Sequence, residues 1–200
     1  MGEPIDRGRR QLLTVATTLT GAVGVAFAAV PFLASWKPSA RAKALGAPVE
    51  IDISKLEPGA MITFEWRGTP VMVVRRTPEM IERLGANDER LADPGSERSK
   101  QPDYAKNAAR AIDPEIFVVL GVCTHLGCLP QNRFSPGASA DGVLKADWPG
   151  GFFCPCHGSM FDLSGRVFRG VPAPTNLEVP PYTMIASGHI VIGLDQGSTA

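Results

Sequence analysis

The chain has 200 residues, and its 20 basic side chains balance its 20 acidic ones, so the formal net charge is zero. A neutral chain gives no electrostatic reason to expect a nucleic-acid partner. The length leaves room for one domain of ordinary size beside a membrane anchor.

An uncharged run from Gln11 to Trp36 lies near the N-terminus. It is longer than the roughly 20 residues that a helix needs to cross a bilayer. Arg7, Arg9 and Arg10 precede it, and basic residues before a span stay in the cytoplasm. A cleaved secretory signal is the alternative, but no small-x-small cleavage site follows a short apolar core. We therefore expect a cytoplasmic tail over 1–10 and a retained anchor over 11–36 in contact with membrane lipid.

Two short segments flank the expected anchor. Arg9-Arg10-Gln11-Leu12-Leu13 resembles a twin-arginine export signal, although an arginine pair also satisfies the charge rule for membrane orientation. Residues 37–47 mix small and charged side chains, which would not bury well. They predict either a solvated spacer or a flexible tether in front of the domain.

From residue 48 to residue 200 the chain contains short β-rich runs bounded by Gly, Pro or Asp. Such runs are typical of strands. They predict an all-β fold class, an antiparallel β sandwich. The predicted strands are Val49–Ile53, Met61–Trp66, Val71–Arg75, Ile116–Gly121, Thr183–Ser187 and His189–Leu194.

A charged insertion at about 76–113 interrupts these strands. Thr77 followed by Pro78 is typical of a helix start, because threonine caps well and proline suits the first helical position. A solvated insertion is the first interpretation of the segment, and a surface for a partner is the second.

Two six-residue segments contain all four cysteines and two of the three histidines. Each segment supplies two cysteines and one histidine, whereas a zinc finger groups like ligands together. One thiolate and one imidazole from each loop suit a two-iron cluster in which two histidines replace two cysteines on one iron. Tetrahedral zinc, or two disulfides with incidental histidines, are the alternatives. The segments are Cys123-Thr124-His125-Leu126-Gly127-Cys128 and Cys154-Pro155-Cys156-His157-Gly158-Ser159.

The pair CTHLGC and CPCHGS resembles the Rieske iron–sulfur protein family, and within it the membrane-anchored Rieske subunits of cytochrome bc complexes. The resemblance covers roughly residues 9–194 and implies one 2Fe–2S cluster. It also implies a disulfide between Cys128 and Cys156 that clamps the two loops, and disulfides persist in oxidising compartments such as the periplasm. By this resemblance the iron ligands are Cys123 and Cys154 on one iron, and His125 and His157 on the other.

Four further residues are expected around the cluster by the same resemblance. Gly127 and Gly158 would let backbone N–H groups approach inorganic sulfur, because glycine lacks a Cβ. Ser159 would donate its hydroxyl to a bridging sulfide. Phe161 stands where many relatives carry a tyrosine that bonds a ligand sulfur, so we expect a lower reduction potential than in those relatives.

A proline-rich loop follows the second motif, Gly170-Val171-Pro172-Ala173-Pro174. It resembles the family's cover over the cluster, and Pro172 and Pro174 would stiffen it because proline fixes φ. Val171 departs from the usual family form. Leu126, at the tip of the first motif, would face a quinol pocket. The remaining histidine, His189, lies far from both motifs and is expected in packing or at the surface.

The resemblance implies an electron-transfer subunit of a quinol–cytochrome c oxidoreductase in a bacterial inner membrane. His157 would bond the ubiquinol hydroxyl and accept its proton, and His125 would be the second exposed ligand. Histidine ligation lifts the potential of such centres to roughly −150 to +300 mV. The implied partners are a cytochrome b subunit, a c-type cytochrome subunit, ubiquinol and inner-membrane lipid, in a complex whose relatives are dimeric.

Three alternatives remain open on the sequence. The first is a plastoquinol-oxidising Rieske subunit, although the long segment 129–153 looks more like respiratory bacterial members. The second is the electron relay of another exported oxidoreductase, such as arsenite oxidase. The third is a redox-inactive zinc module, which would be colourless and free of iron.

Overall fold

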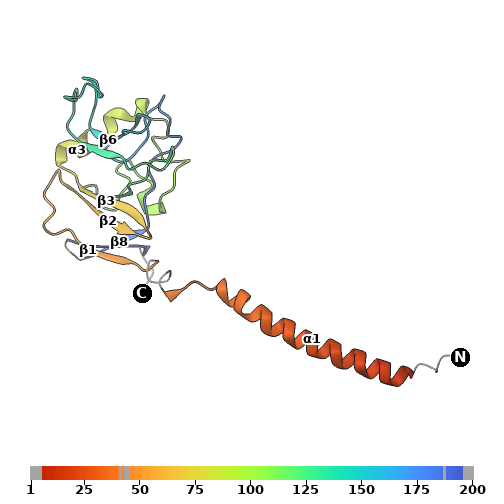
Figure 1. Cartoon of the computed structure of the whole chain (residues 1–200). Helices are drawn as coiled ribbons and strands as arrows, with labels where there is room; N and C mark the ends of the chain where they lie inside the picture. The colour runs from red at the N-terminus through yellow and green to blue at the C-terminus, as the bar shows by residue number, and fades with distance from the viewer. Residues whose placement is uncertain (1–5, 41, 43–45, 187, 196–200) are drawn as a thin grey trace. The chain divides into compact units, whose positions relative to one another are not determined.

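The computed structural model describes residues 6–40, 42, 46–186 and 188–195, and it divides into two compact units, 1–44 and 45–200. The first unit contains one long helix and the second contains short strands (Figure 1). The predicted boundaries of tail, anchor and tether stay predictions. Four positions of the expected tether, 41 and 43–45, lie outside the described residues.

Helix α1 (Arg7–Ser35) has 29 residues. At 1.5 Å per residue it is about 43 Å long, more than the roughly 30 Å hydrocarbon core of a bilayer. The Asp6 carboxylate caps it by accepting hydrogen bonds from the amides of Gly8 and Arg9 at 3.0 and 3.1 Å. The helix is long and apolar enough to cross a membrane, and its described residues include no buried ones.

Four threonines make the first half of α1 less apolar than most membrane spans. Each hydroxyl donates to the carbonyl four residues earlier, at 2.8 or 2.9 Å. A hydroxyl that is satisfied within its own helix does not carry an unpaired donor into lipid. The threonines are therefore compatible with a membrane span; they are Thr14, Thr17, Thr18 and Thr20.

The second unit contains three antiparallel sheets of three strands each. The predicted all-β, antiparallel fold class is confirmed. In sheet order the strands are β1 (Val49–Asp52), β9 (His189–Ile192) and β8 (Tyr182–Ala186); β2 (Met61–Trp66), β3 (Thr69–Arg75) and β4 (Ile116–Leu120); and β5 (Gln131–Arg133), β6 (Gly151–Cys154) and β7 (Ser159–Phe161).

The six predicted strands are all present, and their ends differ from the prediction by at most two residues. The turn between β2 and β3 shows why this pairing was predictable. Arg67 and Gly68 have φ of 54° and 72°, the left-handed pair that a two-residue hairpin turn requires, and Trp66 pairs with Thr69. The short strands β5, β6 and β7 were not predicted.

The predicted helix start at Thr77 is confirmed. Its hydroxyl accepts a hydrogen bond from the amide of Met80 at 3.3 Å, and Pro78 is the first residue of α3 (Pro78–Glu82). Two 3-10 helices follow, η1 (Gly85–Arg90) and η2 (Asp103–Ala105).

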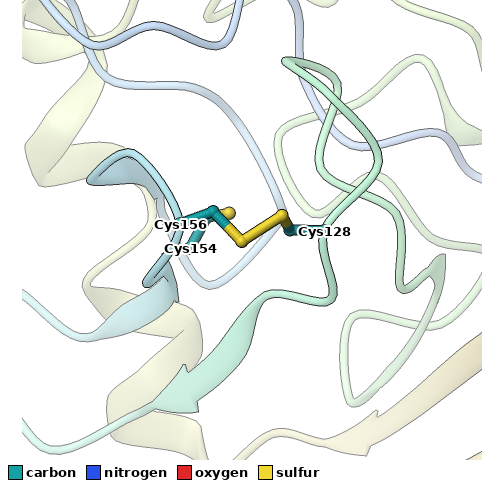
Figure 2. A group of neighbouring side chains, drawn as sticks. All are labelled: Cys128, Cys154 and Cys156. Carbon is teal, nitrogen blue, oxygen red and sulfur yellow. A yellow bond between two sulfur atoms is a disulfide. The ribbon is translucent and has the colours of Figure 1, made fainter.

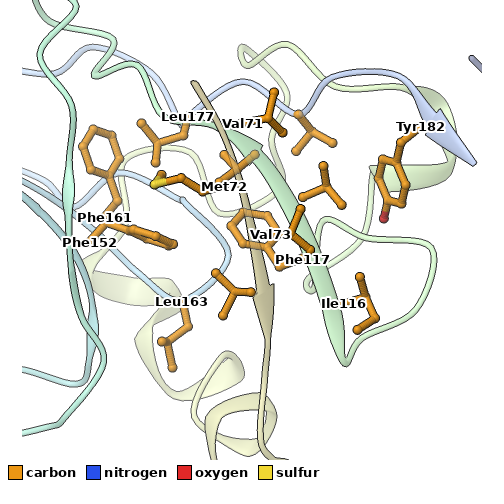
Figure 3. Packing of buried hydrophobic residues seen from close by; sticks show 14 of the residues in the cluster. Val71, Met72, Val73, Ile116, Phe117, Phe152, Phe161, Leu163, Leu177 and Tyr182 are labelled. Carbon is orange, nitrogen blue, oxygen red and sulfur yellow. The ribbon is translucent and has the colours of Figure 1, made fainter. Parts of the chain in front are cut away.

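The core contains side chains from all three sheets, and part of it lies between the central sheet β2–β3–β4 and the sheet that carries the second cysteine motif. Phe152 and Phe161, from β6 and β7, gather with Met72 and Phe117, from β3 and β4 (Figure 3). The rings of Phe117 and Phe152 are 6.2 Å apart. Burying each large apolar side chain stabilises the fold by roughly 1.5–3 kcal/mol, so this contact fixes the motif-bearing sheet on the central one.

The expected solvated insertion over 76–113 has many exposed side chains, but it also contains buried charged ones that were not predicted. Arg76 and Arg110 are only 1% and 0% exposed, and they donate to the hydroxyl and the carbonyl of Ser164 at 3.2 and 3.1 Å. The Arg76 guanidinium also lies over the ring of Phe117. Burial lowers the pKa of both arginines to about 10, so both stay charged at neutral pH. The segment is therefore partly buried, and its two buried arginines are held by partners distant in sequence.

Candidate metal centre

The two cysteine motifs form loops with the same internal closure. The first follows β4, and the second connects β6 to β7. The amide of Gly127 donates to the carbonyl of Cys123 at 2.9 Å, and the amide of Gly158 donates to the carbonyl of Cys154 at 3.0 Å. Both glycines have positive φ, 83° and 77°, a conformation that other residues rarely adopt. Each loop therefore turns back on its first cysteine and presents its histidine beside it.

The two free thiols and the two imidazoles differ in how deeply they are buried. Cys123 and Cys154 are each 2% exposed, whereas His125 is half-buried and His157 is exposed. The imidazole rings lie 4.7 Å apart, edge to face. Burial raises the pKa of the Cys154 thiol, and its hydrogen bond with the Cys123 thiol and the nearby charge of that thiol raise it further. Two sulfur donors therefore lie inside and two nitrogen donors lie toward the surface.

This donor set fits a two-iron cluster. His125 Nδ1 is buried and has no hydrogen-bond partner among the described residues, as expected of a nitrogen that binds a metal. Thiols that hold their protons when buried together release them to a metal cation, because the metal binds the thiolate form. The two sulfur and two nitrogen donors match the ligand set of one cluster with two histidines on one iron.

A disulfide between Cys128 and Cys156 joins the two loops, with their Cα atoms 6.6 Å apart. Cys154 lies beside it, and the sulfur atoms of the three cysteines are within 4.8 Å of one another (Figure 2). These three are not a ligand set, because two of them are already bonded to each other. The bridge spans 28 residues, for which the chain-entropy model gives about 3–4 kcal/mol of stabilisation. The disulfide therefore holds the two motif loops together.

The proline-rich loop, here residues 170–175, is bonded to both motif loops. The hydroxyl of Thr124 donates to the carbonyl of Thr175 at 2.7 Å. The amide of Ala173 donates to the hydroxyl oxygen of Ser159 at 3.1 Å, and both residues are buried. Because the hydroxyl oxygen of Ser159 accepts this hydrogen bond, the hydroxyl proton of Ser159 can be donated to a different acceptor.

The exposed residues of the site lie at the loop tips. Pro172 and Pro174 are exposed on either side of the buried Ala173. Leu126 is 70% exposed and follows His125 at the tip of the first motif loop. Leu129, just after this loop, is also exposed, at 53%. His189 lies elsewhere, on β9, and is close to Glu50 and Asp52.

Sequence reasoning noted Asn176 and Leu177 only as the continuation of the run that resembles the proline-rich loop, and it assigned Asn176 no role of its own. The Asn176 side chain is 1% exposed and makes hydrogen bonds to residues 80 and 83 positions away. A single asparagine after a proline-rich run has no distinctive spacing. Its role became visible only from its contacts.

Comparison with known proteins gives two family matches. The Rieske [2Fe-2S] domain family matches residues 48–182, and the family described as "Ubiquitinol-cytochrome C reductase Fe-S subunit TAT signal" matches residues 5–39. The ubiquinol-cytochrome c reductase iron-sulfur subunit of Allochromatium vinosum is 56% identical over 97% of this chain and 92% of its own length. The subunit of the same name from Blastochloris viridis is 43% identical over 92% of each chain.

Among solved structures, a chain of a hyperthermophilic respiratory Complex III is 26% identical, with a TM-score of 0.46. The match covers 90% of this chain and 98% of that one.

Proposed function

The chain belongs to the family of Rieske iron–sulfur subunits of ubiquinol–cytochrome c reductase, and on that premise we propose that it takes one electron from ubiquinol at the periplasmic face, passes it to a c-type cytochrome, and takes up the quinol proton on a ligand histidine. Members of this family carry one 2Fe–2S cluster and are part of an oxidoreductase complex. The zinc alternative is therefore not retained. The relay of another exported oxidoreductase has no observation in its favour.

The proposed ligands are Cys123 and Cys154 on one iron and His125 and His157 on the other. The observation that supports this assignment is the sorting of the donors, with two buried thiols in contact and two imidazoles 4.7 Å apart nearer the surface. When bound, the cluster supplies a one-electron acceptor. The protein contributes the stapled loops, and the buried Ala173 and Ser159 keep water from that side.

His157 is the residue that we assign to the quinol. Its ring is exposed, so a quinol hydroxyl can donate a hydrogen bond to it and transfer the proton there. His125 is half-buried and is the second, less accessible ring. Leu126 would pack against the apolar wall of the quinol site, because it is exposed at the tip of the first motif loop, directly after His125.

The proposals for the membrane anchor and for the partners rest on the same family membership. The twin-arginine match over 5–39 and the exposed apolar helix α1 indicate a membrane-anchored protein. We propose that the tail is cytoplasmic and that residues 48–200 lie in the periplasm, since basic residues precede the helix. The proposed partners are a cytochrome b subunit and a c-type cytochrome subunit within a dimeric complex. A tether over 37–47 would let the domain move between them.

A redox titration of the full chain in detergent tests the function. The reduced-cluster EPR signal is followed against potential at several pH values. We expect a positive midpoint that falls as the pH rises in the alkaline range, because a histidine that gains a proton on reduction couples the two events. A low midpoint that does not change with pH would instead indicate a simple ferredoxin-like relay.

Replacing Phe161 with tyrosine is expected to raise the midpoint. Phe161 is fully buried on β7 and pairs with Phe152, so the added hydroxyl would be the only polar change and would supply the hydrogen bond to sulfur that this chain lacks. The matched control is Phe153→Tyr, the same chemical change on the neighbouring strand, for which we expect no shift. An unchanged or lower midpoint in Phe161→Tyr contradicts the interpretation.

A further inference from the structure

We propose that Asn176 is a positioning residue that fixes the proline-rich loop against both motif loops and so directs the Ser159 hydroxyl toward the cluster. The inference rests on the ligand set proposed above. It gives a role in the redox chemistry to an amide whose hydrogen bonds go to Val167, Asp93 and Ser96.

Asn176 is buried, and its side chain forms hydrogen bonds with Val167 and with the segment 93–99. Its Oδ1 accepts from the amide of Val167 at 2.8 Å. Its Nδ2 donates to the carbonyl of Asp93 at 2.9 Å and to the hydroxyl of Ser96 at 3.0 Å, 83 and 80 residues earlier in the chain. Its backbone amide donates to the hydroxyl of Ser99 at 3.1 Å. One side chain therefore joins the end of the proline-rich loop to the 93–99 segment and to residue 167.

The 93–99 segment is itself a rigid base for this contact. The buried carboxylate of Asp93 accepts from the amides of Glu97 and Arg98, at 2.8 and 3.1 Å, and from the hydroxyl of Ser99 at 2.7 Å. These bonds lower the pKa of Asp93 despite its burial, so the carboxylate stays ionised and keeps the turn closed. Asn176 is thus anchored to a turn that is fixed independently.

Two hydrogen bonds connect the anchored proline-rich loop to the two cluster loops. The carbonyl of Thr175, the residue before Asn176, accepts from Thr124 in the first loop. The amide of Ala173, three residues before Asn176, donates to Ser159 in the second loop. Because a hydroxyl that accepts from one side donates toward another, the Ala173 bond sets the direction of the Ser159 proton.

The chemistry of asparagine suits this place better than that of its nearest substitutes. The site needs one acceptor and two donors from one short planar group, and a carboxamide supplies both. Alanine would leave the Val167 amide and the Asp93 carbonyl buried without this partner, which costs stability. Aspartate would lose both donors and add a second buried charge near Asp93.

The test compares Asn176→Ala with the unsubstituted full chain, by two readouts other than turnover. The first is hydrogen exchange at Ala173, which carries the one amide hydrogen between Pro172 and Pro174. We expect this amide to exchange faster in the variant. The second is the midpoint of the cluster, which we expect to fall, because hydrogen bonds to sulfur favour the reduced form. Asn176→Ser serves in place of Asn176→Ala if that variant does not assemble.

The decisive comparison is made in a Ser159→Ala background. If Asn176 acts through the Ser159 hydroxyl, its replacement lowers the midpoint only when Ser159 is present. The matched control is Asn87→Ala, another buried asparagine that bonds a main-chain carbonyl in the 76–113 segment, and it is expected to leave the midpoint unchanged.

Three results overturn the proposal: unchanged exchange at Ala173, faster exchange with an unchanged midpoint, or an equal fall in midpoint without the Ser159 hydroxyl. Failure of the proposed function would look different. In that case the unsubstituted chain itself would lack the signal of a histidine-ligated cluster.

Discussion

Replacing His157 with alanine in the full chain is expected to abolish the cluster. The variant should bind no stable pair of irons and give no reduced-cluster EPR signal, because the second iron would lose one of its two protein ligands. His125→Ala should give the same result from the other loop. Iron content and the EPR signal of the purified full chain measure both outcomes.

The chain contains its own control for this experiment. His189 is the third histidine, and it lies on β9, with Nδ1 3.3 Å from Glu50 and Nε2 3.9 Å from Asp52. His189→Ala should therefore keep full iron content and an unchanged signal. Retention of both irons and of the signal in His157→Ala would contradict the proposed ligand set. Loss of the cluster in His189→Ala would show that the test reports general instability.

The two motif loops were recognisable from the sequence because their residues are local. Two cysteines and a histidine within six residues indicate a metal site without any knowledge of the fold, and the assignment of the ligands stays a prediction. The strands of the central sheet were predictable for a similar reason. β2 and β3 are runs of β-forming residues joined by Arg-Gly, and a two-residue turn fixes their register.

The short strands around the second motif were not predictable, because their pairing depends on the motif itself. β7 has three residues, Ser159–Phe161, and β6 ends at a metal-ligand candidate, Cys154. Neither run has the alternation that indicates a strand. Gly151, with φ of 154°, lets β6 lie close to the backbone of Phe161 in β7, and Gly150, with φ of 94°, leaves room for the backbone of Phe134 after β5.

The buried arginines of the insertion were not predicted, because charge was taken as a sign of exposure. Arginine is almost never fully buried unless it is paired, and its partners here lie far along the chain. Arg76 reaches Ser164, which is 88 residues away. The residues near Arg76 in the sequence do not include this partner, so burial of the guanidinium could not be inferred from them. The same limit hid the contact between Asn176 and Asp93.

Asp162→Ala is expected to lower the free energy of unfolding by about 3 kcal/mol, the lower end of the cost of breaking a buried ion pair. Asp162 and Arg166 are each about 1% exposed, and their charged atoms lie 2.8 Å apart. The Asp162 carboxylate also accepts from the amides of Ser164 and Arg166, so its loss opens the turn that follows β7. Asp88, at 2.8 Å from Arg166, limits the cost because one carboxylate remains.

Asp147→Ala is the matched control for this effect. Arg90 and Asp147 form the same kind of pair at 3.0 Å, but both side chains are largely exposed. Exposed pairs are worth 0–1 kcal/mol because water and salt screen them, so about 1 kcal/mol is the most that this variant should lose. Denaturant unfolding of the full chain in detergent, followed by tryptophan fluorescence, measures both. Equal losses in the two variants would mean that burial of the Asp162–Arg166 pair does not support the base of the second cluster loop.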